Sequence, residues 1–306
     1  MSAGWVAGDV RAVAMSRRVL GLHGARRIAA SKGLADALGA LMTTPYSRDI
    51  KPDQSLDAAQ RAIAATLLWN MRVLAGWAPS AGISMLRVAT AWFEIANIEA
   101  RFRAADAGDK APAFDLGGLA ISWRRLADIS QDHALREELA TTWWGRADDD
   151  SARAIGLMMR SRLLDRATSA VPGGRAWATG AAALLVAREQ LLAERELPPG
   201  VRRLLGKILG MRAVDARSLT ALQEALPRNA RWALAGVNQP EDLWLAEAHW
   251  WTRVERDGRV LLRSSSLGPE PVVGAIAVMA TDAWRTRAAL EIAARGGRLE
   301  DFDALA

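Results

Sequence analysis

One stretch near the C-terminal end, 271–297, limits the fold more than any other part of the chain. Apolar residues recur in it at helical spacing, and neither Pro nor Gly interrupts 275–295. Pro271 suits a first helical turn, and Gly296 and Gly297 suit a helix end. The stretch therefore predicts one long, buried helix. Its C-terminal half carries three arginines that complement the helix dipole: Arg285, Arg287 and Arg295.

The composition favours helices throughout the chain. Ala, Leu and Arg dominate, β-branched runs are scarce, and hydrophobic residues make up 51% of the 306 residues. A chain of this length is expected to divide into two or three units, because single cores stop growing near about 250–300 residues. The absence of Cys excludes disulfides, cysteine-ligated zinc and a cysteine nucleophile. No long apolar run predicts a membrane span, and the N-terminus does not read as a secretory signal.

Helical periodicity recurs along the whole chain, and polar or Pro/Gly-rich breaks separate the segments. The breaks at 106–115 and 196–200 predict three units, 1–105, 106–195 and 196–306. A small hairpin around Asp257-Gly258 and a helix running into a loop are both compatible with 254–262. Ser218 is expected to cap a helix. Helices are predicted over 5–22, 33–44, 55–76, 83–105, 116–129, 134–144, 151–170, 176–195, 201–226 with a turn near Asp215, 241–256 and 271–297.

Four short motifs occur in a fixed order. The first places Trp5 ahead of Arg11, and the second is Thr44-Pro45-Tyr46, a turn that anchors the only tyrosine. The third sets an acid, an amide and a guanidinium along one strip of a helix, which suits holding a neighbouring loop. Its residues are Glu94, Asn97, Ile98, Arg101 and Arg103. The fourth comprises Pro271, Val273, Gly274, Arg285, Arg287, Ile292, Arg295 and Gly296.

In this order the motifs resemble the C subunit of V-type and A-type rotary ATPases, called the d subunit in eukaryotes. The resemblance covers the chain and is diffuse between 110 and 260. The sequence departs from the family at Val10-Arg11-Ala12, where the family has Arg-Val-Arg, and at Glu94, where it has Asp. A second acid and Asn strip is missing before Arg188.

The resemblance implies an all-α fold of three similar helical units in a pseudo-threefold funnel. It implies a non-catalytic central-stalk subunit that couples the stalk to the membrane rotor ring in ion or proton transport, peripheral to the cytoplasmic face of the membrane. Neither a cofactor nor a small-molecule substrate nor nucleic acid is expected. Arg101, Arg188 and Arg295 end successive helices and mark a faint threefold repeat.

Two other classes stay open. The net charge of +6 suggests a free-standing helical adaptor or nucleic-acid-binding protein, although the cations are interleaved with acids and form no block of five. An enzyme is the third class, but no nucleophile elbow or paired-carboxylate cleft is identifiable.

Several stretches imitate functional sites. Gly200 to Ile208 resembles a phosphate loop but has the wrong spacing and no Ser or Thr after Lys207. The aspartates at 148–150 could attract a divalent ion or begin a helix, and the helix start is preferred. The Trp pairs at 143–144 and 250–251 either fill the core or present one ring to a partner. His23, His133 and His249 share no metal-ligand spacing.

Overall fold

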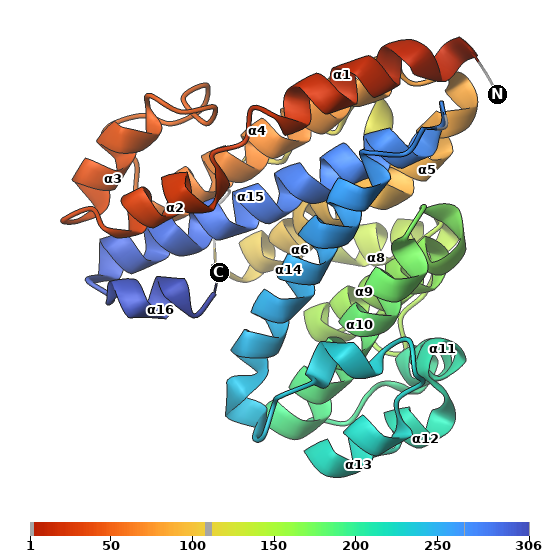
Figure 1. The fold of residues 1–306 in the computed structure, drawn as a ribbon. Coiled ribbons are helices and arrows are strands. Elements are labelled where there is room, and N and C mark those ends of the chain that lie inside the picture. The colour runs from red at the N-terminus through yellow and green to blue at the C-terminus, as the bar shows by residue number, and fades with distance from the viewer. Residues whose placement is uncertain (1–2, 108–111, 266, 306) are drawn as a thin grey trace. The chain divides into compact units, whose positions relative to one another are not determined.

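The computed structural model describes residues 3–107, 112–265 and 267–305 (Figure 1). Within these ranges the protein consists of sixteen α-helices with short 3-10 and π turns, and it contains no strand. The predicted all-α class is confirmed, whereas the pseudo-threefold funnel stays a prediction. Residues 108–111 of the predicted 106–115 linker lie outside the described residues. The described helices include none long and apolar enough to cross a membrane.

The chain forms two compact units. Unit 1 comprises residues 1–82 and 251–306, and unit 2 comprises residues 83–250. The divisions fall inside α5 (Ser80–Thr90) and α14 (Leu243–Leu261). The finer division into three units with borders after 105 and 195 stays a prediction.

Unit 1 is built around α15 (Pro269–Arg295), which contacts every other long helix of the unit's N-terminal part. In Figure 1 this blue helix runs beside the red α1 and α2. The elements packed around it are η1 (Ala3–Trp5), α1 (Val6–Ser16), α2 (Gly21–Ala29), α3 (Leu34–Leu41), α4 (Leu56–Trp77), the end of α14 and α16 (Leu299–Asp303).

The sequence explains the length and burial of α15. Pro269 and Pro271 occupy its first turn, and Gly296 ends it with φ +68° while donating its N–H to the Ile292 carbonyl. All residues from 271 to 283 are buried, so neighbours surround this part on every side. The prediction of one long buried helix is confirmed. Arg285, one of the three arginines of its C-terminal half, is also buried.

Two glycines let α14 and α15 cross closely. A Cβ placed on Gly274 would lie 2.5 Å from the Gly258 carbonyl oxygen and 2.8 Å from the Leu262 nitrogen. Because both atoms belong to the backbone, they have little freedom to move away. Asp257 and Gly258 belong to helix α14, so the hairpin considered at 254–262 is not formed. Gly258 serves the helix crossing instead of a turn.

Unit 2 has two apolar clusters, and α9 contacts α6, α10 and α11. Ser151 and Ser218 cap α9 and α13 by accepting from the backbone three residues on, so the predicted Ser218 cap is confirmed. The elements of unit 2 are most of α5, α6 (Trp92–Ala107), η2 (Gly117–Leu119), α7 (Trp123–Leu126), α8 (Asp132–Thr141), α9 (Ala152–Ala170), α10 (Gly174–Val186), the π-turn η3 (Ala187–Leu192), α11 (Pro199–Leu209), α12 (Met211–Val214), α13 (Leu219–Ala225), η4 (Arg231–Leu234), η5 (Pro240–Asp242) and the start of α14.

Four predicted helices are shorter than their apolar patterns suggested, and the first is 5–22, where α1 ends at Ser16 before α2 begins at Gly21. The segment 83–105 divides at Ala91 into α5 and α6, and 116–129 contains only η2 and α7. The segment 201–226 divides into α11, α12 and α13: the predicted turn near Asp215 is confirmed between α12 and α13, whereas the break at Gly210, with φ +88°, was not predicted. Periodicity marks which residues are buried, but it continues across such breaks and does not locate them.

We expect Gly274→Ala to destabilise the protein. The added methyl meets backbone, so the free energy of unfolding should fall by about 1–3 kcal/mol despite alanine's higher helix propensity. Gly39→Ala is the matched control, because that helical glycine has no atom within 4 Å of an added Cβ. It should be neutral or stabilise by up to about 1 kcal/mol. Equal effects of the two substitutions in urea unfolding would contradict the close crossing.

Candidate functional site

The most unusual polar group of unit 1 is Asp282, a carboxylate in the middle of the buried helix α15. Its side chain is held by three donors from distant parts of the sequence. One oxygen accepts from the Gly21 N–H at 2.7 Å, and the other accepts from the Leu20 N–H at 3.0 Å and the Tyr46 hydroxyl at 2.8 Å. We name these four residues the Asp282 clasp. Asp282 and Tyr46 are 3% and 5% exposed, so the carboxylate and the phenol are both buried.

Local sequence positions each donor of the Asp282 clasp. The two amides belong to the start of α2, where backbone N–H groups lack helical partners and the dipole favours a negative charge. Gly21 adopts φ +72°, a conformation that glycine takes without strain. Thr44 sets the tyrosine turn by donating its hydroxyl to the Leu41 carbonyl at 2.7 Å and accepting the Tyr46 N–H at 3.2 Å.

Unit 2 contains a second clasp around Glu94, near the start of α6. Its two oxygens accept from the Ile121 N–H at 2.6 Å, the Ser122 N–H at 2.8 Å and the Trp144 indole N–H at 2.7 Å. Glu94 is 1% exposed and Trp144 is fully buried. We name these four residues the Glu94 clasp.

The two clasps follow the same plan. In each, a helix-borne acid accepts from two consecutive amides at the start of a short helix and from the side chain of one buried aromatic residue. In each, the aromatic residue follows a threonine by two positions. Thr142 donates to the Leu139 carbonyl at 2.7 Å and accepts the Trp144 N–H at 3.2 Å, which repeats the geometry of Thr44. Units 1 and 2 therefore share one local hydrogen-bond pattern.

Burial changes the ionisation of the Asp282 clasp. Desolvation raises the pKa of Asp282 above its ordinary value, although its hydrogen-bond donors oppose the shift. Desolvation and the neighbouring carboxylate raise the pKa of Tyr46 well above its ordinary value, because a tyrosinate would be buried beside a negative charge. The phenol is therefore held as a neutral donor, which suits a structural role.

Asn97 and Arg101 hold a loop beside the Glu94 clasp. The Asn97 side chain donates to the Phe114 carbonyl at 2.9 Å and accepts the Phe114 N–H at 2.7 Å. Arg101 donates to the Ile129 carbonyl. The predicted strip of Glu94, Asn97 and Arg101 thus binds the backbone of the chain between α6 and α8, which is the loop-holding role that its spacing indicated.

The other predicted motif residues lie apart from the clasps or beside them on α15. Trp5 packs over Gly82, and the Arg11 guanidinium lies 5.6 Å from the centre of the exposed Trp77 ring. Arg285 pairs with Glu255 of α14 at 3.0 Å. Two exposed arginines complete the set, with Arg287 donating to Gln60 at 3.2 Å and Arg295 pairing with Glu291 one turn earlier.

The Arg285 pair shows how α15 and α14 are joined by charge. Burial raises the pKa of Glu255, but hydrogen bonds and charges of Arg259 and Arg285 outweigh it and lower the pKa below its ordinary value. Glu255 therefore stays ionised and serves as the counter-ion of a buried guanidinium.

The stretches that imitate chemical sites have structural roles. Residues 200–207 lie within helix α11 and cannot form a phosphate loop. Asp148 accepts the Gly200 N–H at 2.8 Å, and Asp149 accepts the Ser151 N–H at 2.8 Å, so both cap backbone. Among the described residues no cluster of His, Asp and Glu could hold a metal ion. The three histidines are exposed.

The tryptophan pairs are mainly internal. Trp144 belongs to the Glu94 clasp, and Trp143 meets it edge to face with ring centres 4.6 Å apart. Trp250 donates to the Trp177 carbonyl at 2.9 Å, and Trp251 stacks on Trp284 at 5.7 Å. Trp143, Trp250 and Trp251 are only partly buried, and contact of their rings with a partner stays a prediction.

Sequence reasoning found Tyr46, Glu94 and Asn97 but missed Asp282 and the role of Trp144. Two signals in the sequence could have identified these residues. An aspartate stands in an otherwise apolar run of α15, and the pattern Thr-x-aromatic occurs at 44–46 and again at 142–144. The chain matches no protein-family model and no curated protein.

Tyr46 provides a direct test of the Asp282 clasp. Because its folded pKa is raised, it stabilises the protein fully below about pH 10, the unfolded value, and this contribution is lost as pH rises above it. Tyr46 is the only tyrosine, so tyrosinate absorbance reports it alone. We expect this absorbance to appear only together with unfolding in an alkaline titration. Tyrosinate formed in the folded protein near pH 10 would contradict the clasp, and Tyr46→Phe supplies the baseline.

Glu94 is expected to contribute more to stability than a surface glutamate. Glu94→Ala leaves two amides and one indole N–H buried without partners, at about 1–3 kcal/mol each, so unit 2 should lose at least about 3 kcal/mol in urea unfolding. Glu137→Ala is the control, because its pair with Arg146 is exposed and exposed ion pairs contribute little to stability. Similar losses in both variants would show that the Glu94 contacts are dispensable.

Proposed function

We propose that this chain is a non-catalytic central-stalk subunit of a V/A-type rotary ATPase that couples the stalk to the membrane rotor ring. One observation carries the proposal: the motif residues that resemble the C-subunit family, Tyr46, Glu94 and Asn97, are all buried and hold separate segments of the chain together. A resemblance carried by scattered surface positions would have weaker support. The proposal also includes a pseudo-threefold funnel of helical units and a location at the cytoplasmic face of the membrane.

The chemistry of the clasps favours a mechanical role. A general acid or nucleophile must reach its substrate, whereas Asp282 and Glu94 are closed to solvent and engaged by three donors each. Each carboxylate instead ties three distant segments together. Such cross-links suit a body that must transmit torque without yielding.

The recurrence of one clasp pattern in both units also supports the proposal, since the family is built from similar helical units. Two copies of the clasp are present in the described residues. The faint threefold repeat of Arg101, Arg188 and Arg295 stays a prediction, and the Arg188 guanidinium pairs with Glu247. A third unit would therefore use other contacts, as the missing acid and Asn strip at that position already indicated.

The alternative is a free-standing helical adaptor or nucleic-acid-binding protein. Its support is the basic N-terminal segment, in which residues 1–32 contain five Arg and one Lys against one Asp. Binding of duplex DNA that weakens steeply with salt would favour this alternative.

Native purification separates the two functions. Tagged chain isolated from its own cells should bring down rotary ATPase head and ring subunits. In membrane vesicles from cells carrying Glu94→Ala, ATP hydrolysis should continue while ATP-driven ion pumping falls by at least about tenfold, because a coupling subunit connects the two activities. Cells carrying Glu137→Ala are the control and should pump normally. Recovery of the chain without ATPase subunits would contradict the proposal.

A further inference from the structure

The two clasps differ in the kind of aromatic donor that completes each of them. Asp282 accepts from the phenol O–H of Tyr46 at 2.8 Å, whereas Glu94 accepts from the indole N–H of Trp144 at 2.7 Å. A hydroxyl oxygen can donate or accept a hydrogen bond, but an indole or backbone amide N–H can only donate. The Asp282 clasp therefore contains one hydrogen bond whose direction can reverse, and the Glu94 clasp contains none.

Thr286 gives a reversed phenol an acceptor. It is fully buried on α15, and its hydroxyl donates to the backbone carbonyl of Asp282 at 2.7 Å. Its side chain also makes a hydrogen bond with the Tyr46 hydroxyl. Because the Thr286 oxygen has lone pairs left, it can accept from Tyr46 while it still donates to the Asp282 carbonyl.

These groups form a complete relay for a protonated Asp282. The acid donates from Oδ2 to the Tyr46 oxygen, the phenol donates to the Thr286 oxygen, and Thr286 donates to the Asp282 carbonyl. The Leu20 and Gly21 amides keep Oδ2 and Oδ1 as their acceptors. A proton added to this clasp thus leaves no buried donor without a partner, which would otherwise cost about 1–3 kcal/mol.

The surroundings of Asp282 favour the neutral acid. Burial raises its pKa above the ordinary value, although the three donors and the charge of Arg285 oppose the shift. A raised pKa in the folded state means that the bound proton stabilises the fold. This contribution is complete below about pH 3.9, the unfolded value, and is lost as the pH rises through the folded value.

Arg285, three positions along α15, is the charged group that acts on Asp282, and its counter-ion is Glu255 of α14. Other charged side chains on the elements around α15 are exposed or half-buried and do not bond to the Asp282 carboxylate. They are Arg11 of α1, His23, Arg26 and Arg27 of α2, Asp36 of α3, Asp57, Arg61 and Arg72 of α4, Arg259 of α14, and Glu300, Asp301 and Asp303 of α16.

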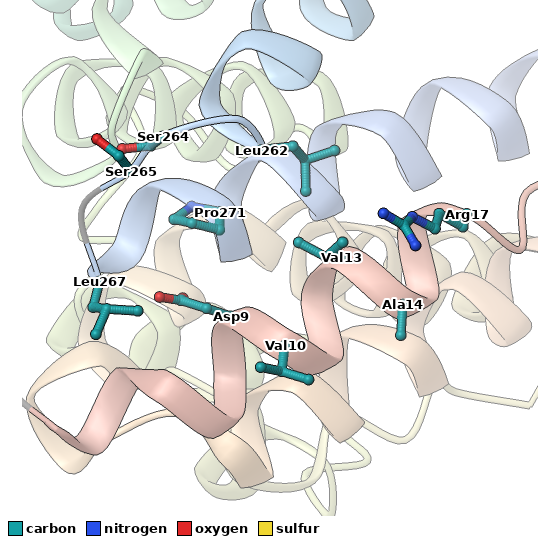
Figure 2. A pocket seen from close by; sticks show the side chains of 10 residues that line it. All are labelled: Asp9, Val10, Val13, Ala14, Arg17, Leu262, Ser264, Ser265, Leu267 and Pro271. Atoms are coloured by element: carbon teal, nitrogen blue, oxygen red, sulfur yellow. The ribbon is translucent and has the colours of Figure 1, made fainter.

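Asp9 is the other buried acid among the described residues of unit 1, and burial raises its pKa too. It lies in the wall of a hollow of about 420 Å³ beside α1 (Figure 2). One of its oxygens accepts the Gly268 N–H at 3.2 Å, and the other has no hydrogen-bond partner among the described residues. No residue of the Asp282 clasp lines this hollow. Asp9→Asn is therefore a control that removes a second titrating acid without altering the clasp.

We infer that the Asp282 clasp is a proton-binding site that stays closed in both protonation states. The ionised carboxylate accepts from the Tyr46 hydroxyl. When a proton from solvent binds to Oδ2, the acid donates to the same phenolic oxygen, and the phenolic hydrogen turns to Thr286. The Glu94 clasp offers no acceptor for such a proton, because its three partners are N–H donors. The inference stands whether or not the chain belongs to a rotary ATPase.

Tyr46 reports the reversal directly, because it is the only tyrosine. We choose protein labelled with ¹³C at the tyrosine Cζ, which gives one magnetic resonance signal whose shift differs between a phenol that donates to a carboxylate and one that accepts from an acid. During acid titration, with folding followed by circular dichroism, this signal should change reversibly with a midpoint above about pH 4. The change should disappear in Asp282→Asn and persist in Asp9→Asn.

Thr286→Val tests the relay without removing the acid or the phenol. It takes away the acceptor that only the protonated clasp needs, so the midpoint should fall by at least about one pH unit, which equals tenfold weaker proton binding. Thr281→Val is the matched control. Thr281 is also fully buried on α15 and donates to the Ala277 carbonyl one turn earlier, so this variant should keep the original midpoint.

Three outcomes would overturn the inference. The first is a Tyr46 signal that does not move while the protein stays folded down to about pH 4. The second is a signal that moves only together with the loss of helical circular dichroism, because the proton then binds to the unfolded chain. The third is an equal midpoint in Thr286→Val and Thr281→Val, which would show that the relay is not used.

Discussion

Burying a carboxylate inside a helical protein is costly unless each oxygen is given donors, and this constraint organises both units. Asp282 and Glu94 each meet it with two consecutive backbone amides and one aromatic side-chain donor. The amides come from the start of a short helix, where they lack helical partners. These hydrogen bonds offset the cost of burying each carboxylate and fix the position of a helix end. The long helices supply apolar burial, but the clasps determine where the short helices dock.

Much of the fold follows from the sequence because its main signals are local. Apolar periodicity, Pro271 at a helix start, Gly296 at a helix end and Ser218 as a cap act over a few residues. The crossing of α14 and α15 could not be predicted from such local signals, because Gly258 and Gly274 become neighbours only after folding. The clasps combine local signals with contacts that form only after folding. Their threonine turns are local, whereas the pairing of Asp282 with Tyr46 joins residues that are 236 positions apart.

The functional proposal depends on how the predicted motif residues are used. Tyr46, Glu94 and Asn97 act on backbone and side chains of their own unit. A rigid body built in this way suits the transmission of force.

Native-state hydrogen exchange at the clasp amides tests this account most directly. The amides of Leu20, Gly21, Ile121 and Ser122 bond to carboxylates instead of to a helical ladder. The account predicts that the first pair exchanges only when unit 1 unfolds and the second only when unit 2 unfolds, as slowly as the central amides of α15 and α9 respectively. Exchange of these amides at the rate of exposed loops, with the helices still protected, would contradict it.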